Sequence, residues 1–188
     1  PDLLKVLVSE AALDADRLQG LRKLLGSLID QDIMEVEQAY VELFDRGRAT
    51  SLHLFEHVHG DSRDRGPAMI DLAQNYEKAG LFLAPGELPD YLPVVLEFAS
   101  TQPPKEARAF LGEMVHILNA IFSALQQRHS AYASVLGALI ELAGERAQSV
   151  KVTADEPLDQ AWEEPQVFDG CSSKGQAKPG QPQPIHIV

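Results

Sequence analysis

The chain has 188 residues, with 28 acidic against 16 basic side chains, and its formal net charge is −12 at pH 7. This length suits one domain with its own core, and the charge argues against binding to nucleic acid or an anionic membrane while it favours a basic partner. The single cysteine, Cys171, excludes an internal disulfide and fits a reducing cytoplasm, and no apolar run approaches the roughly 20 residues that span a bilayer.

The first half of the chain shows the periodicity of three helices. Residues 13–29 place leucines at steps of three and four. Residues 32–45 begin with Asp32-x-x-Glu35, which is typical of a capping box, and continue with apolar residues on one face. Residues 67–79 begin with Pro67 and end before a glycine, as helices commonly do.

The second half repeats this pattern and predicts further helices. Residues 88–100 are rich in Leu, Val and Phe, and residues 104–126 carry one broad apolar stripe that predicts a single long helix. Residues 130–146 are expected to form another, with Ser130 as its N-cap and Gly144 as its stop. Since no sustained alternation of β-branched residues occurs, we expect an all-α, single-domain bundle of six or seven helices.

The composition changes after Lys151. We expect an all-helical domain over 1–152, followed over 153–188 by an acidic segment and a flexible Gly/Pro/Gln-rich tail that is disordered. Residues 153–188 together hold six acids and two bases, so 22 acids and 14 bases belong to the helical part. The predicted folded domain is therefore acidic in its own right.

A zinc motif is the first candidate for chemistry. Residues 53–57 spell H-x-x-E-H, the pattern of an inverted zinc protease, with His53, Glu56 and His57 on a predicted helix. Zinc needs a third protein ligand, and a zinc-dependent hydrolase therefore stays an alternative beside an ordinary polar helix face. The sequence does not choose among the downstream candidates for that ligand, which are Glu77, Glu87 and Glu97.

A group of arginines is the second candidate. A cofactor or nucleotide carrier would use arginine forks on phosphate oxygens. The four arginines are Arg46, Arg48, Arg63 and Arg65. The alternative is an ion network within the segment, because four carboxylates balance the arginines and neither glycine-rich phosphate motif occurs. Those carboxylates are Asp45, Glu56, Asp61 and Asp64.

No catalytic set emerges from the remaining residues, and we expect that the protein is not an enzyme. Cys171 lies in the predicted tail, there is no G-x-S-x-G elbow, and the adjacent Glu163 and Glu164 would point apart on a helix. Recognition is favoured instead. A helical domain with an apolar groove and a carboxylate rim suits a basic amphipathic helix.

The block "YVELFDRGRATSLHLFEHVHGDSRDRGPAMIDL" at 40–72 resembles the signature of the nitrate reductase molybdenum-cofactor assembly chaperones. This is the NarJ group of the TorD-like redox-enzyme maturation chaperones. Phe44 to Arg48 match its F-D-R-G-R, and residues 55–60 match its F-E-H-V-H-G. The segments "ELPDYLPVVLEF" at 87–98 and "AWEEPQVF" at 161–168 are similar to further parts of the family, so the resemblance covers roughly residues 1–170.

The resemblance implies an all-helical cytoplasmic chaperone without catalytic activity. Such a protein binds the N-terminal, signal-like peptide of the reductase's catalytic (α) subunit. It supports insertion of the molybdenum cofactor into that client, binds no cofactor stably itself and has no stable place in the membrane.

We therefore predict that the signature block forms the peptide-binding site. The apolar candidates are Tyr40, Leu43, Phe44, Leu54 and Phe55, and the polar candidates are Asp45, Arg46, Arg48, Glu56, His57, His59, Asp61 and Asp64. Whether the polar side chains contact the client or one another stays open at this point.

Overall fold

The structure is a computed structural model, and it describes residues 2–9, 13–60 and 62–151. Contacts group residues 1–155 into one compact unit. The tail predicted over 153–188 lies outside the described residues, and the predicted boundary after residue 152 stays a prediction.

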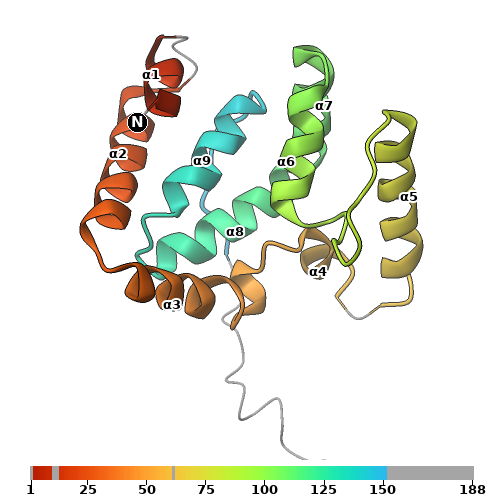
Figure 1. The fold of residues 1–188 in the computed structure, drawn as a ribbon, viewed down its shortest axis with the longest axis horizontal. Coiled ribbons are helices and arrows are strands. Elements are labelled where there is room, and N and C mark those ends of the chain that lie inside the picture. Colours follow the sequence, from red (N-terminus) through yellow and green to blue (C-terminus); the bar gives the residue numbers. More distant parts are fainter. Residues whose placement is uncertain (1, 10–12, 61, 152–188) are drawn as a thin grey trace, which may run out of the picture. The chain divides into compact units, whose positions relative to one another are not determined.

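The described residues form nine α-helices and one short 3₁₀-helix, η1, and they contain no β-strand. The helices are α1 (Asp2–Ser9), α2 (Ala15–Asp30), α3 (Ile33–Phe44), η1 (Arg48–Thr50), α4 (Leu54–Val58), α5 (Arg65–Lys78), α6 (Leu92–Thr101), α7 (Pro104–Glu113), α8 (Val115–Gln127) and α9 (Ala133–Leu142) (Figure 1). The all-α prediction is confirmed. The count exceeds the predicted six or seven because α1 and α4 are too short to show a clear period and one predicted helix is divided.

Local signals place several helix ends. Asp14 accepts a hydrogen bond from the backbone N–H of Arg17 at 2.7 Å, and Asp32 accepts one from the N–H of Met34 at 2.9 Å. These carboxylates satisfy N–H groups that have no partner within the helix. Gly144 follows α9 with φ of +91°, which a side chain would strain.

The single helix predicted over 104–126 is wrong, since α7 and α8 meet at an angle of 64°. The break lies at Met114, the residue between α7 and α8, whose φ is −98° and ψ is −2°. Leu111 in α7 packs with Ala99 and Ala143, whereas Leu118 in α8 belongs to the main core. Because of the bend, one apolar stripe contributes side chains to two separate clusters. A straight helix would not reach both. No single described helix has the length and apolar character to cross a bilayer; α7 and α8 meet those criteria only as a bent pair.

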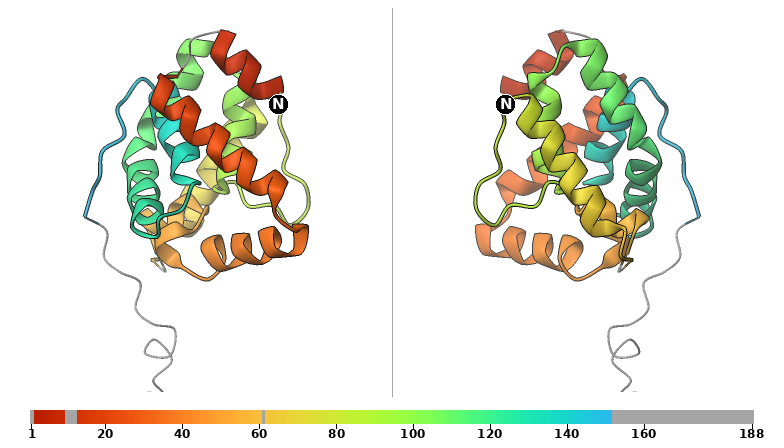
Figure 2. Two further views of the ribbon diagram at one scale, coloured as in Figure 1. Left: turned by 90° about the vertical axis from the view of Figure 1, so that its left-hand side faces the viewer. Right: turned by 90° about the vertical axis from the view of Figure 1, so that its right-hand side faces the viewer.

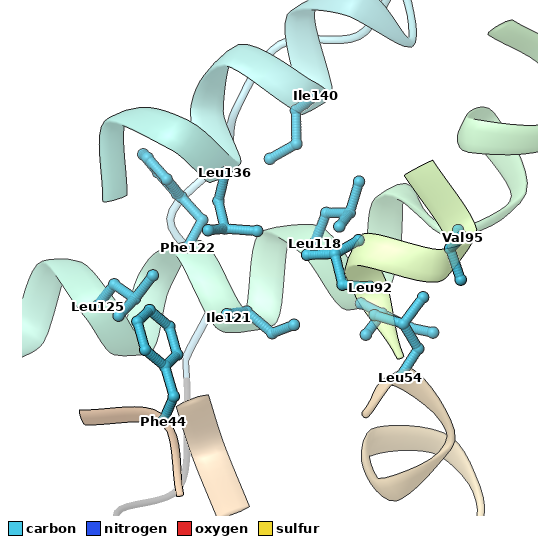
Figure 3. Close-up of a cluster of buried hydrophobic side chains, with 11 residues drawn as sticks. Phe44, Leu54, Leu92, Val95, Leu118, Ile121, Phe122, Leu125, Leu136 and Ile140 are labelled. Atoms are coloured by element: carbon cyan, nitrogen blue, oxygen red, sulfur yellow. The ribbon is translucent and has the colours of Figure 1, made fainter. Parts of the chain in front are cut away.

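The core surrounds α8, which runs through the middle of the unit with α9 packed along it (Figure 1). Leu118, Ile121 and Leu125 of α8 have no solvent exposure. Figure 3 shows Phe44 reaching Leu125 from one side, while Leu54 and Leu92 approach the other end of the cluster. Each such burial contributes about 1.5–3 kcal/mol, so residues from α3, α4, α6, α8 and α9 stabilise one core.

A second contact joins α2 to α9. Arg17 Nε lies 2.9 Å from Glu141 Oε1, and its guanidinium stands 5.6 Å from the ring centre of Phe122. Gly137 makes this approach possible, because an added Cβ there would lie 2.1 Å from Arg17 Nη1. The two views in Figure 2 show α2 on one side of the unit and α5 on the other.

Candidate functional site

A buried carboxylate organises the segment that the sequence singled out. Asp90 precedes α6 and is fully buried. The N–H of Phe55 donates to its Oδ2 at 3.1 Å, and the N–H of Leu54 donates to its carbonyl at 3.0 Å. Asp90 thus caps the N-terminus of α4 from a distant part of the chain, because α4 has no side-chain cap of its own.

The charges around Asp90 are directed at one another. Arg65 Nη2 lies 3.8 Å from Asp90 Oδ2 and 3.5 Å from Glu56 Oε1. His53 Nδ1 lies 3.4 Å from Asp90 Oδ1, and the His53 ring lies 5.2 Å from the ring of Tyr91, centre to centre. Arg65 and Glu56 therefore pair with each other within the chain. The sequence had left open whether these side chains pair with each other or contact a partner.

The other histidines of the block also have partners within the chain. His57 Nε2 lies 2.9 Å from the backbone oxygen of Ser51, and the His59 ring meets Phe55 edge-on at 5.4 Å. Gly60 has a φ of +53°, and a Cβ there would lie 3.0 Å from Arg48 Nη2. These contacts hold α4 and its flanking turns in one arrangement.

The zinc centre that the sequence left as an alternative is not assembled among the described residues. His53 lies before α4 at its N-cap position, not on the helix, and it faces Asp90, while His57 faces Ser51. Among the residues that the structure describes, no three His, Cys, Asp or Glu groups form a metal-binding cluster. Of the candidate third ligands, Glu87 accepts from the N–H of Ala84 at 3.0 Å; Glu77 and Glu97 are exposed.

The arginines give little support to a phosphate site. Arg65 is directed at two carboxylates, whose charge opposes a phosphate at the same place. Arg46 and Arg63 are exposed and make no ion pair with a described residue.

The apolar candidates lie in the main core or pack against it. Phe44 is buried, and its ring lies 4.7 Å from that of Tyr40 and 5.1 Å from that of Tyr132. Burial raises the pKa of the Tyr40 hydroxyl, and a hydrogen bond with Tyr91 raises it further. Leu54 is also in the core, and the carbonyl of the half-buried Leu43 accepts from the hydroxyl of Thr50. These residues shape the interior of the unit.

A groove of about 860 Å³ lies beside this block, between α5 and the group α6, α7 and α8, with α4 at one end. Figure 1 shows α5 facing α6 and α7 across this region. Most of its surface is apolar, supplied by Phe55, Val58, Ala68, Leu72, Ala79, Phe98, Phe110, Met114 and Ile117. Its polar residues are Asp71, Asn75, Lys78, Gln102, Glu106, Glu113 and His116.

Three carboxylates, Asp71, Glu106 and Glu113, stand on the exposed side of the groove. Within the described residues none of them forms an ion pair. The groove therefore combines an apolar floor with negative charges that are available to a ligand, a combination that suits a basic amphipathic helix.

Of the residues predicted to bind a peptide, Phe55 alone lines this groove in the described structure. Asp45 and Asp64 flank α3 and α5 as exposed cap residues, and Asp61 lies outside the described residues. Contact of the block with a client stays a prediction. Sequence reasoning missed the groove residues of α5 and α7, because an apolar stripe looks the same whether it faces the core or a cleft.

Comparison with known proteins identifies the family. The profile described as "Nitrate reductase delta subunit" matches residues 10–138. The chain belongs to the nitrate reductase delta subunit family. It is 43% identical over 176 residues to the nitrate reductase molybdenum cofactor assembly chaperone NarJ of Escherichia coli (strain K12), a match that covers 88% of this chain and 75% of that protein.

Two further members of the family extend the comparison. The probable chaperone NarW of Escherichia coli (strain K12) is 42% identical over 151 residues, or 75% of this chain and 65% of NarW. The probable chaperone NarJ of Bacillus subtilis (strain 168) is 34% identical over 101 residues, or 54% of this chain and 55% of that protein. The resemblance seen in residues 40–72 is confirmed, and the helices that line the groove lie within the matched range.

Proposed function

We propose that this protein is a cytoplasmic assembly chaperone of nitrate reductase. It binds the N-terminal, signal-like peptide of the catalytic subunit and supports insertion of the molybdenum cofactor into that client. Family membership supports the general role, since relatives are named as molybdenum cofactor assembly chaperones of nitrate reductase. The protein acts by binding, and the cofactor is cargo of the client.

The groove between α5 and α6–α8 is the observation that carries the peptide-binding part of the proposal. A volume of about 860 Å³ holds roughly two turns of helix, because a helix with its side chains is about 10 Å wide and rises about 5.4 Å per turn. Phe55, Phe98 and Phe110 offer aromatic surface to the apolar side of such a helix. Asp71, Glu106 and Glu113 offer carboxylates to its basic side.

The Asp90 network gives the groove a fixed end. Phe55 is both a lining residue and the residue whose N–H donates to Asp90. The polar contacts of the signature block therefore position an aromatic wall of the groove. This assigns the block a positioning role, with direct client contact through Phe55.

Calorimetry with a synthetic peptide of the catalytic subunit's N-terminus tests the proposal. Val58 lines the groove and is 50% exposed, so Val58→Lys changes the groove without opening the core. We expect peptide binding at least tenfold weaker, because a buried ammonium would oppose the basic, apolar ligand. Ile70→Lys is the matched control, since Ile70 on α5 is 59% exposed and does not line the groove. Equal affinities in the two variants would contradict the assignment of the groove.

A further inference from the structure

A second, smaller pocket lies between the end of α5, the loop that connects α5 to α6, and α6 itself (Figure 1). Its volume is about 220 Å³, so it admits a single side chain but not a helix, which is about 10 Å wide. Three aromatic residues line it, Tyr76 of α5, Phe82 of the loop and Phe98 of α6. The rings of Tyr76 and Phe98 lie 4.7 Å apart, centre to centre, and Phe82 is 79% exposed. We call this cavity the loop pocket.

Two carboxylates also line the loop pocket. Val94, Glu97 and Phe98 share one side of α6, because they are spaced three and four residues apart. Glu87 belongs to a closed turn of the loop. Its side chain accepts from the N–H of Ala84 at 3.0 Å, and its own N–H donates to the carbonyl of Ala84 at 3.1 Å. Both glutamates are exposed, and neither forms an ion pair with a described residue.

This lining selects the chemistry of a ligand. The faces of aromatic rings attract organic cations, and carboxylates attract positive charge. A hard metal ion prefers oxygen ligands alone, and the described residues contain no group of three His, Cys, Asp or Glu that could hold one. Leu81, Leu83 and Val94 add apolar surface that suits an alkyl stem. An ammonium or guanidinium group on an apolar stem, as in Lys and Arg, therefore matches the pocket.

The loop pocket adjoins the groove. Phe98 lines both, and its ring lies 4.7 Å from that of Tyr76 in the pocket and 4.9 Å from that of Phe110 in the groove. Along the chain, Ala79 of the groove and Leu81 of the pocket are two residues apart. One row of aromatic rings thus connects the two sites, and a peptide in the groove is within reach of the pocket.

We propose that the loop pocket binds one Lys or Arg side chain of the peptide that occupies the groove, an inference that rests on the proposed function. The stem packs against Leu83 and Val94. The cation lies against the ring of Phe82 and near the carboxylates of Glu87 and Glu97. The pocket thereby fixes the register of the peptide, because it accepts a cation at one position of the bound peptide and not at its neighbours.

A double-mutant cycle measured by calorimetry tests the proposal. The client peptide is compared with versions in which each basic residue in turn is replaced by norleucine. We expect Glu97→Gln and Phe82→Ala each to weaken binding of the unaltered peptide about fivefold to tenfold, and to have no further effect on one of the norleucine versions. Leu88→Ala, in the same loop, and Glu77→Gln, on α5, are the matched controls, since both side chains are exposed and line neither site.

The outcomes separate this proposal from the proposed function. Binding that is weakened by Val58→Lys but unchanged in Glu97→Gln and Phe82→Ala would overturn the loop pocket and leave the groove in place. Equal losses with every norleucine version would also overturn it, because they would reflect the general charge of the surface. Thermal unfolding confirms that the variants are folded, since Phe82 and Glu97 are exposed.

A small probe tests the pocket without the client peptide. N-acetyl-arginine amide is titrated into the isotope-labelled full chain, with the neutral citrulline analogue and magnesium chloride as controls. We expect amide shifts in residues 81–87 and 94–98 with the arginine compound alone, and their loss in Phe82→Ala. Equal shifts with citrulline or magnesium would overturn the proposal. Arginine shifts in a chain that does not bind the client peptide would assign the pocket to a cation from another source and overturn its link to the client.

Discussion

Two charged regions of this chain use their charges differently. In residues 43–66, Glu56 and Arg65 are paired with each other, and Arg65 and His53 face the buried Asp90. At the rim of the groove, Glu106 and Glu113 are exposed and form no ion pair with a described residue. In the region with the recognisable motif, the charges of Glu56 and Arg65 therefore stabilise the fold. The region that carries charge for a ligand lies on helices without a distinctive motif.

The largest expected effect tests the first region. Asp90→Ala removes the cap of α4 and leaves the N–H of Phe55 and the guanidinium of Arg65 without their buried acceptor. We expect the free energy of unfolding to fall by about 2–4 kcal/mol, measured by urea denaturation. Asp90→Asn should recover part of the loss because its amide oxygen still accepts from Phe55.

Asp71→Ala is the control for that comparison. Asp71 is an exposed carboxylate of the groove rim, and its removal should change the stability by no more than about 0.5 kcal/mol. Equal losses for Asp90→Ala and Asp71→Ala would show that the two regions do not differ as described.

The next effect tests the second region. Glu106→Lys with Glu113→Lys should leave the unfolding free energy nearly unchanged and weaken client-peptide binding about tenfold at low salt. The loss should appear mainly in the association rate, since rim charges guide encounter. Stopped-flow fluorescence measures this, with Glu77→Lys outside the groove as control. An association rate that is insensitive to both salt and substitution would show that the rim carboxylates take no part in recognising the client peptide.

The smallest effect concerns a tyrosine beside the Asp90 network. Tyr76 is buried and donates its hydroxyl to the carbonyl of Pro89 at 2.8 Å. We expect Tyr76→Phe to cost about 1 kcal/mol at neutral pH.

The same hydroxyl makes stability depend on alkaline pH. Burial raises the pKa of Tyr76, and the charge of Asp90 raises it further. An unfolded chain releases this proton near pH 10, whereas the folded chain retains it. Its contribution is therefore complete below pH 10 and is lost as the pH rises beyond that value. Chemical denaturation between pH 8 and 11 should show this fall, and a smaller fall in Tyr76→Phe. Identical pH profiles would contradict the linkage.

Some elements followed directly from the sequence. Asp32 is the N-cap of α3, as its spacing from Glu35 predicted. The break at Met114 did not follow, because an apolar stripe continues through it and only packing against two clusters reveals the bend. The H-x-x-E-H match failed for a related reason, since the helix begins at Leu54 and leaves His53 outside.

The sequence by itself determined the all-α class, the acidic character of the chain and its membership of the nitrate reductase delta subunit family. These depend on periodicity, composition and motif, which can be read from the sequence without knowing how the helices pack. Only the tertiary structure decided that Asp90 caps α4 from 35 residues away and that α5 faces α6–α8 across a groove. Both depend on which apolar faces pack together, and an apolar stripe in the sequence does not specify the helix that it packs against.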